Sequence, residues 1–268
     1  MGAGATSGIK AGIAAATDDE LKKAIASLDQ SAKAKLQAAL NPASPFSFAS
    51  GLPDCCTSNP EAYSVLAELP NFRLVEMKVP PGGADKPHDH PSHSMYFLKP
   101  AKLEITDYDE SGKSKDNAHV AEVPAGACPI FPAGAHQVKN VGDEEAQVIF
   151  IEAFPMCKPC GSPDGFISPF TVAPQCYKIL AENDDFYTGM MTMEPGEEDP
   201  IHNHKDHLIY VIEGGEVTIS GFGGEPMVVP MTAGAAIPAP MSAPPFAQHT
   251  LKNTGSTTLK LLFFEMKL

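Results

Sequence analysis

The sequence predicts an all-β protein of two tandem domains, preceded by one amphipathic helix. Its 268 residues include 26 Pro and 22 Gly but no Trp, a composition typical of short strands joined by tight turns. Short apolar runs bounded by Gly and Pro follow one another from Phe72 to the C-terminus. One block of motifs also occurs twice at a fixed spacing, which indicates a duplicated architecture.

The first 48 residues are expected to lie apart from the β domains. Residues 1–16 are small residues with a single Lys, so we expect a flexible N-terminus there. Thr17 and Glu20 then form a capping-box signature, and apolar residues recur at helical spacing until Pro42. The N-terminal helix is therefore predicted within residues 17–48, packed outside the main body.

The rest of the chain contains two series of predicted strands. The first series comprises Phe72–Val79, Met95–Leu98, Leu103–Tyr108, His119–Val123, Ala135–Val141 and Gln147–Phe154. The second series comprises Phe186–Met193, Leu208–Ile212, Glu216–Ser220, Met227–Val229, Gln248–Asn253 and Leu259–Met266. These series predict a first domain over residues 49–155, a linker over residues 156–176 and a second domain over residues 177–268.

The two series are copies of one another. Five residues of the first copy recur 114 residues later: Gly82, His88, His90, His93 and Tyr96. Three further residues recur 113 residues later: His136, Asn140 and Glu152. A spacing that stays constant over so many positions indicates two homologous domains, with one net residue lost in the second.

Eight of the nine histidines belong to the repeat. They are His88, His90, His93 and His136 in the first copy, and His202, His204, His207 and His249 in the second. Residues i and i+2 of a strand point to the same side, so each His-x-His pair presents two imidazoles together. A later His can complete a set suited to a divalent transition metal such as Fe, Mn, Ni, Cu or Zn. We expect one metal per domain, and we interpret His119, which lies outside the pattern, as a structural residue.

The residues around these histidines resemble the cupin family, in its two-domain form called a bicupin. The first family motif places a Gly five residues before His-x-His, as Gly82 and Gly196 do here. The second motif is matched in the first copy, with one residue fewer before the His, by Gly126, Pro132, Gly134, His136 and Asn140. The resemblance implies two tandem jelly-roll barrels, also called double-stranded β-helices.

The second copy departs from the second motif while keeping its chemistry. It retains Gly234, Pro240, His249 and Asn253, but Ser242 replaces the middle Gly and a longer loop precedes the His.

The glutamate ligand that the resemblance implies is absent from this sequence. Counted forward from His-x-His, its position falls on Ser94 and Leu208. Counted backward from Gly214 it falls on His207, and the repeat then gives His93. We prefer the backward count because a strand is more rigid than a loop. Each site is then a four-His set, or a three-His set if His93 and His207 point away. Neutral imidazoles suit transition metals and disfavour Mg and Ca.

The predicted function is that of a metal-dependent oxidoreductase, dioxygenase-like, which acts on a small organic molecule that chelates the metal. Strand alternation places mainly apolar residues beside the histidines, and no Asp or Glu is visibly aimed at the metal as a general acid or base. Three alternatives stay open. They are a non-enzymatic metal or small-ligand binding or sensing bicupin, a non-redox metal-dependent lyase or isomerase, and a storage or structural bicupin.

Charge and hydropathy exclude other classes of protein. The net charge of −14 repels nucleic acid and anionic lipid, so we expect no nucleic-acid partner. No transmembrane segment or signal peptide is recognisable, which predicts a cytoplasmic protein with a small-molecule substrate or ligand, and a homo-oligomer is one option. The first six residues match the N-myristoylation pattern but lack a polybasic second anchor.

The six cysteines carry little functional signal. Cys157 and Cys160 form a Cys-x-x-Cys in the linker, which we interpret as a structural disulfide or as inert thiols. A structural zinc shared with Cys55 or Cys56 is the first alternative. Thiol redox catalysis is the second, although an all-β setting lacks the helix N-terminus that such chemistry uses.

Overall fold

The computed structural model describes residues 50–154, 165–221, 224–239 and 248–267. The predicted flexible N-terminus, the helix expected within 17–48 and the Cys157/Cys160 pair lie outside these residues. The described residues are dominated by antiparallel strands, with two four-residue helices, α4 (Cys55–Ser58) and α5 (Pro169–Val172). The predicted all-β class is confirmed over this part of the chain.

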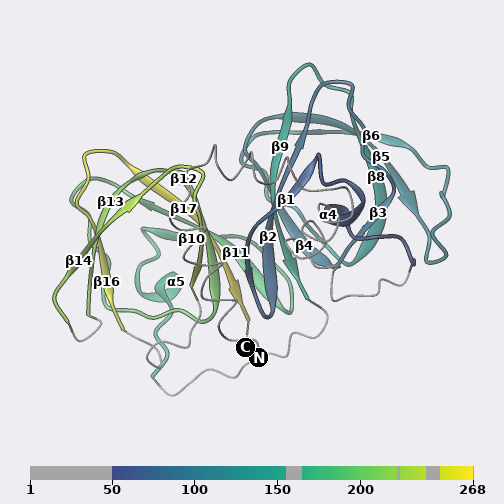
Figure 1. Cartoon of the computed structure of the whole chain (residues 1–268). Helices are drawn as coiled ribbons and strands as arrows, with labels where there is room; N and C mark the ends of the chain where they lie inside the picture. The colour runs from purple at the N-terminus through teal and green to yellow at the C-terminus, as the bar shows by residue number, and fades with distance from the viewer. Residues whose placement is uncertain (1–49, 155–164, 222–223, 240–247, 268) are drawn as a thin grey trace, which may run out of the picture. The chain divides into compact units, whose positions relative to one another are not determined.

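The first barrel consists of two antiparallel sheets (Figure 1). One sheet has the order β1-β2-β9-β4-β7, and the other has the order β3-β8-β5-β6. The strand bounds are β1 Tyr63–Leu69, β2 Phe72–Val79, β3 His88–His90, β4 Ser92–Phe97, β5 Ala101–Tyr108, β6 His119–Val123, β7 Ile130–Phe131, β8 Gly134–Asn140 and β9 Ala146–Ala153.

The second barrel repeats this topology. Its sheets have the orders β10-β11-β17-β12-β15 and β14-β13-β16. The strand bounds are β10 Tyr177–Glu182, β11 Phe186–Met193, β12 His207–Glu213, β13 Gly215–Ser220, β14 Met227–Met231, β15 Ala236–Ala239, β16 Thr250–Asn253 and β17 Leu259–Met266. At the place of β3, the described residues contain only an isolated bridge between His202 and His249. The duplication read from sequence spacing is thus also a duplication of strand order.

Each barrel encloses its own apolar core. In the first barrel, residues such as Val75, Met77 and Phe150 pack together on the inner faces of the strands. The second barrel has an equivalent cluster that includes Met191 and Phe263. Burying each large apolar side chain contributes about 1.5–3 kcal/mol, so these cores hold the sheets that carry the histidines.

A third apolar cluster joins the two barrels. It contains outward-facing residues of both five-stranded sheets, among them Leu74 and Ile151 from the first and Leu208 and Phe264 from the second. Because β9 is therefore buried on both faces, its sequence is a nearly continuous apolar run, whereas β2 carries Arg73, Glu76 and Lys78 among its apolar residues.

Candidate metal centres

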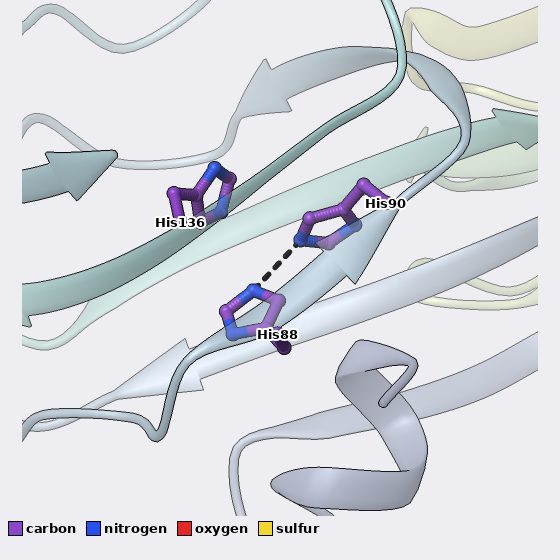
Figure 2. Close-up of side chains that lie close together, drawn as sticks. All are labelled: His88, His90 and His136. Atoms are coloured by element: carbon purple, nitrogen blue, oxygen red, sulfur yellow. Dashed lines mark hydrogen bonds between the residues drawn. The ribbon is translucent and has the colours of Figure 1, made fainter. Parts of the chain in front are cut away.

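The first histidine set forms where β3 pairs with β8. His88 lies directly opposite His136 in that antiparallel pair, and His90 follows two residues after His88 on the same face. The three rings point toward one another (Figure 2). One ring nitrogen from each of these histidines lies within 4.8 Å of the others. The predicted convergence of His-x-His with a later His is therefore present in the structure.

The outer nitrogens of His88 and His90 are already engaged. His88 Nδ1 lies 2.8 Å from the carbonyl oxygen of Lys86, to which only an N–H can donate. His90 Nδ1 lies 2.5 Å from Glu152 Oε1 and donates to that carboxylate. These contacts place the imidazole protons on Nδ1, so both Nε2 atoms carry lone pairs.

The two Nε2 atoms face each other across 2.9 Å. Two lone pairs at that distance repel unless a cation or a proton lies between them. Nitrogen ligands at right angles on a metal, with bonds of about 2.0–2.1 Å, lie about 3 Å apart. The spacing of His88 and His90 therefore fits two adjacent ligands of one ion.

His136 completes the set with an unpartnered atom. Its Nε2 is buried and has no hydrogen-bond partner within the described residues. A buried polar atom without a partner costs about 1–3 kcal/mol, which a metal bond would offset. Burial and the neighbouring histidines lower the pKa of His90 and His136, so both rings are neutral, as a metal ligand must be.

His93 lies beside this set but outside its closest group. It is buried on β4, with its ring centroid 4.9 Å from that of His90. Its Nδ1 lies 2.8 Å from the carbonyl oxygen of Pro91, so its Nε2 is also free of the proton. A fourth-ligand role for His93 stays a prediction, as does that of its repeat partner His207.

The second histidine set has the same design. Ligand atoms of His202, His204 and His249 lie within 4.8 Å of one another, and His202 is bridged to His249 as His88 is to His136. The Nε2 of His202 is buried without a hydrogen-bond partner within the described ranges. His204 Nδ1 donates to Glu265 Oε2 at 3.1 Å.

His207 occupies the place of His93 in this second set. Its ring centroid is 4.5 Å from that of His204, and its Nδ1 donates to the carbonyl oxygen of Lys205 at 2.7 Å. Desolvation, with the neighbouring His204, lowers the pKa of His207 to about 3. Burial also lowers the pKa of His202 and His204, so the three rings of His202, His204 and His207 favour the neutral form.

A buried Tyr–Asp pair supports each His-x-His segment. The Tyr63 hydroxyl donates to Asp85 Oδ2 at 2.8 Å, and that carboxylate lies 3.8 Å from His88 Nδ1. In the second barrel, Tyr177 donates to Asp199 at 2.9 Å. These residues were not identified from the sequence, although the 114-residue spacing that relates the histidines also relates both pairs.

In each barrel, a buried glutamate accepts a hydrogen bond from the second His of His-x-His. The other partners of this glutamate differ between the two barrels. Glu152 accepts from Arg73 Nε at 2.5 Å, and Arg73 also contacts Asp54, all of them buried. At the position of Arg73 the second barrel has Tyr187, which hydrogen-bonds Glu265. The Arg73 guanidinium thus compensates the first carboxylate, whereas the Tyr187 hydroxyl, the Lys205 backbone N–H and the charge of Lys205 serve the second.

A cavity of about 480 Å³ opens beside the first set. His93 and His136 line it together with mainly apolar residues such as Met95, Ile105 and Phe131. This agrees with the expected apolar surroundings. The polar lining was not foreseen.

Three polar residues of this lining change the sequence interpretation: Asp107, Lys115 and His119. His119, read as a structural residue, lines the cavity wall. Asp107 supplies a carboxylate to the cavity beside the first set, where none was expected. Both come from the β5–β6 hairpin, whose register with β8 could not be read from the sequence.

The cysteines of the described residues are all free thiols: Cys55, Cys56, Cys128 and Cys176. Cys55 lies behind the first set, with its Sγ 3.8 Å from Glu152 Oε1. Although Asp54, Cys55 and Cys56 lie close enough to hold an ion, Arg73 already neutralises this region. Burial raises the pKa of Cys55, which keeps it as a thiol.

Comparison with known proteins agrees with this architecture. A family model described as Cupin domain matches residues 189–265. This match begins in β11 and ends in β17 of the second barrel. The first barrel repeats the sheet order and the histidine set of the second, so the chain contains two cupin-like pairs of sheets. No curated protein matches the sequence significantly.

Several solved structures of oxalate decarboxylase from Bacillus subtilis resemble the chain. One, from work on the Mn(II) centres of that enzyme, has 16% sequence identity and a TM-score of 0.49. Another structure, from work on proton-coupled electron transfer in oxalate decarboxylase, has 17% identity and a TM-score of 0.48. Both matches cover 76% of this chain and 72% of the other.

No helix in the described part of this chain is long and apolar enough to cross a membrane.

Proposed function

We propose that this chain is a metal-dependent oxidoreductase, dioxygenase-like, with one divalent transition metal in each barrel and a small organic chelating substrate. His88, His90 and His136 would hold one ion, and His202, His204 and His249 the other, with His93 and His207 as the additional predicted ligands. The observation that carries the proposal is the convergence of three imidazoles in each barrel. The Nδ1 atoms of His88, His90, His202 and His204 contact oxygen acceptors, which leaves their Nε2 atoms available to a metal.

A bound Fe, Mn, Ni or Cu ion would supply a Lewis acid and redox centre at this position. Residues of the chain itself orient the histidine rings and line the cavity. Glu152 orients the His90 ring through its Nδ1–H, and the Phe150 ring stacks on His90 with centroids 5.1 Å apart and planes 5° apart. The apolar lining of the cavity limits water at the first set and offers a surface for an organic molecule.

Metal content and oxygen uptake test this proposal in sequence. Protein purified without added metal or an affinity tag should contain about two equivalents of Fe, Mn, Ni or Cu per chain. A screen of small chelating compounds in an oxygen electrode should then find substrate-dependent uptake. Protein that contains no metal and cannot be reloaded would exclude the proposal.

A non-redox metal-dependent lyase or isomerase is the second candidate. Asp107 favours it, because a carboxylate in the cavity beside His136 can accept a proton from a bound molecule. Tightly held zinc, with substrate turnover but no oxygen uptake, would select this candidate.

A non-enzymatic metal or small-ligand binding protein is the third candidate. It is favoured by the closeness of His93 and His207 to their sets, because four protein ligands leave fewer positions for substrate. Metal binding without turnover of any screened compound would support it.

A further inference from the structure

We infer that Asp107 is the residue that recognises the organic ligand, and that the ligand therefore binds in the first barrel only. This inference deepens the proposed function and rests on it. It predicts a ligand with a hydroxyl donor beside its metal-binding oxygen.

The position of Asp107 follows from strand register. His88 on β3 pairs with His136 on β8, and His136 pairs in turn with Asp107 on β5. Residues directly opposite in an antiparallel pair project from the same face, with Cβ atoms about 4.5–5.5 Å apart. His88, His136 and Asp107 therefore lie side by side on three neighbouring strands, β3, β8 and β5. All three side chains project from the inner face of the sheet.

The surroundings of Asp107 make it a specific contact point. Ile105, on the same face of β5, and Phe131 give the cavity apolar walls, so a carboxylate there stands out as the acceptor for a ligand donor. Asn117 holds it in place: its Nδ2 donates to Asp107 Oδ2 at 2.8 Å, and its Oδ1 accepts from the Asp107 backbone N–H at 3.1 Å. A carboxylate has about four acceptor positions, so this contact leaves capacity for a ligand.

At the equivalent position, the described residues of the second barrel place no carboxylate. Strand β13 pairs with β16 up to Ser220, which lies opposite Thr250. The next residue, Gly221, therefore comes opposite His249, as Asp107 lies opposite His136 in the first barrel. A Cβ on Gly221 would lie 2.6 Å from the carbonyl oxygen of Gln248 and 2.9 Å from His249 Cα. No side chain fits at this position without moving the backbone that carries His249.

The alignment of His88, His136 and Asp107, together with the apolar cavity, indicates the class of ligand. The metal would hold one oxygen of the molecule, Asp107 would accept a hydrogen bond from a neighbouring hydroxyl, and the apolar walls would contact its carbon skeleton. Vicinal hydroxyl compounds such as catechols have these features. 4-Nitrocatechol is a suitable probe because its visible absorption reports binding directly.

The test compares 4-nitrocatechol with its monomethyl ether on zinc-loaded protein. Asp107→Ala should weaken binding of 4-nitrocatechol by about tenfold or more, the loss typical of a charge-assisted hydrogen bond, and binding of the ether by less than about threefold. Asp107→Asn should give an intermediate loss. Glu104→Gln, on the same strand but the other face, should bind both compounds as the wild type does.

Single-barrel variants locate the binding site. His202→Ala with His204→Ala should keep 4-nitrocatechol binding, whereas His88→Ala with His90→Ala should abolish it. Unchanged binding in Asp107→Ala, equal losses for both compounds, or binding in the second barrel alone would overturn the inference. Failure of the wild type to hold Fe, Mn, Ni, Cu or Zn, measured on the same preparation, would instead overturn the proposed function, and the inference with it.

Discussion

The two barrels present the same histidines in different surroundings. In both, three converging imidazoles are backed by a Tyr–Asp pair and by a buried glutamate. The first barrel adds Arg73 behind the glutamate and Asp107 beside the third histidine, where the second has Tyr187 and Gly221. Duplication has thus preserved the groups that would hold a metal, whereas the groups around them have diverged. The two candidate centres therefore share their histidines and differ in the groups that surround them.

The largest expected effect separates the two centres outright. His88→Ala with His90→Ala should remove one metal equivalent per chain and leave the second barrel loaded, because the two sets share no residue. His202→Ala with His204→Ala should give the reciprocal result. Elemental analysis of both variants provides the measurement. Loss of both equivalents from either variant would mean that the barrels do not bind independently.

Acidification should destabilise the metal-free protein through both sets at once. Burial lowers the pKa of several histidines, including His90, His136 and His204. A histidine whose pKa is lower in the folded state than its unfolded value of about 6.5 binds fewer protons when folded. Its contribution is therefore intact above about pH 7 and is lost as the pH falls from there toward the lowered folded value.

Urea unfolding of the metal-free protein between pH 7.5 and 5 provides this measurement. Metal affinity should fall in the same range, because protons compete for the ligand nitrogens. A free energy of unfolding that stays constant across the range would contradict the buried, neutral state of these rings.

Removing the groups behind the glutamates should affect the barrels unequally. Arg73→Met leaves Asp54 and Glu152 buried without their cation, which should cost about 3–5 kcal/mol of unfolding free energy. Tyr187→Phe removes one hydrogen bond to Glu265 and should cost about 1–3 kcal/mol. Denaturant titration of the two variants compares them directly, and equal costs would remove the proposed electrostatic difference.

A matched asparagine pair should behave alike in the two barrels. Asn140 Nδ2 donates to the carbonyl oxygens of Val79 and Glu144, both at 2.8 Å. Asn253 Nδ2 donates to those of Met193 and Thr257 at 2.8 and 2.9 Å. Replacing either Asn with Ala should cost about 1–3 kcal/mol. Thermal denaturation of both variants should show similar decreases in Tm. A large difference between the two decreases would mean that the structural frameworks of the two barrels have diverged as well.

Much of the fold could be predicted from the sequence because the central strands are buried on one or both faces. The bounds of β2, β6, β11 and β17 agree with the predicted runs. Strands β1 and β10 were missed because each contains an irregularity, between Val65 and Ala67 in the first, and their burial does not alternate regularly. Strand β3 is only three residues long and has no periodicity to detect.

Some residues of the candidate site could likewise be predicted from the sequence, and others could not. The histidines could be found because the chemistry requires them at short, repeated spacings along the chain. Asp107 could not, because its closeness to His136 depends on the register between β5 and β8. Glu152 and Glu265 were visible as landmarks of the repeat, but their contact with a histidine Nδ1 some sixty residues away exists only in the folded protein.

Metal content per chain tests the central claim most directly. We predict that protein purified without added metal or an affinity tag contains about two equivalents of a divalent transition metal, one held by each histidine set. Protein that is metal-free and does not take up Fe, Mn, Ni, Cu or Zn on reloading would contradict the assignment of both centres.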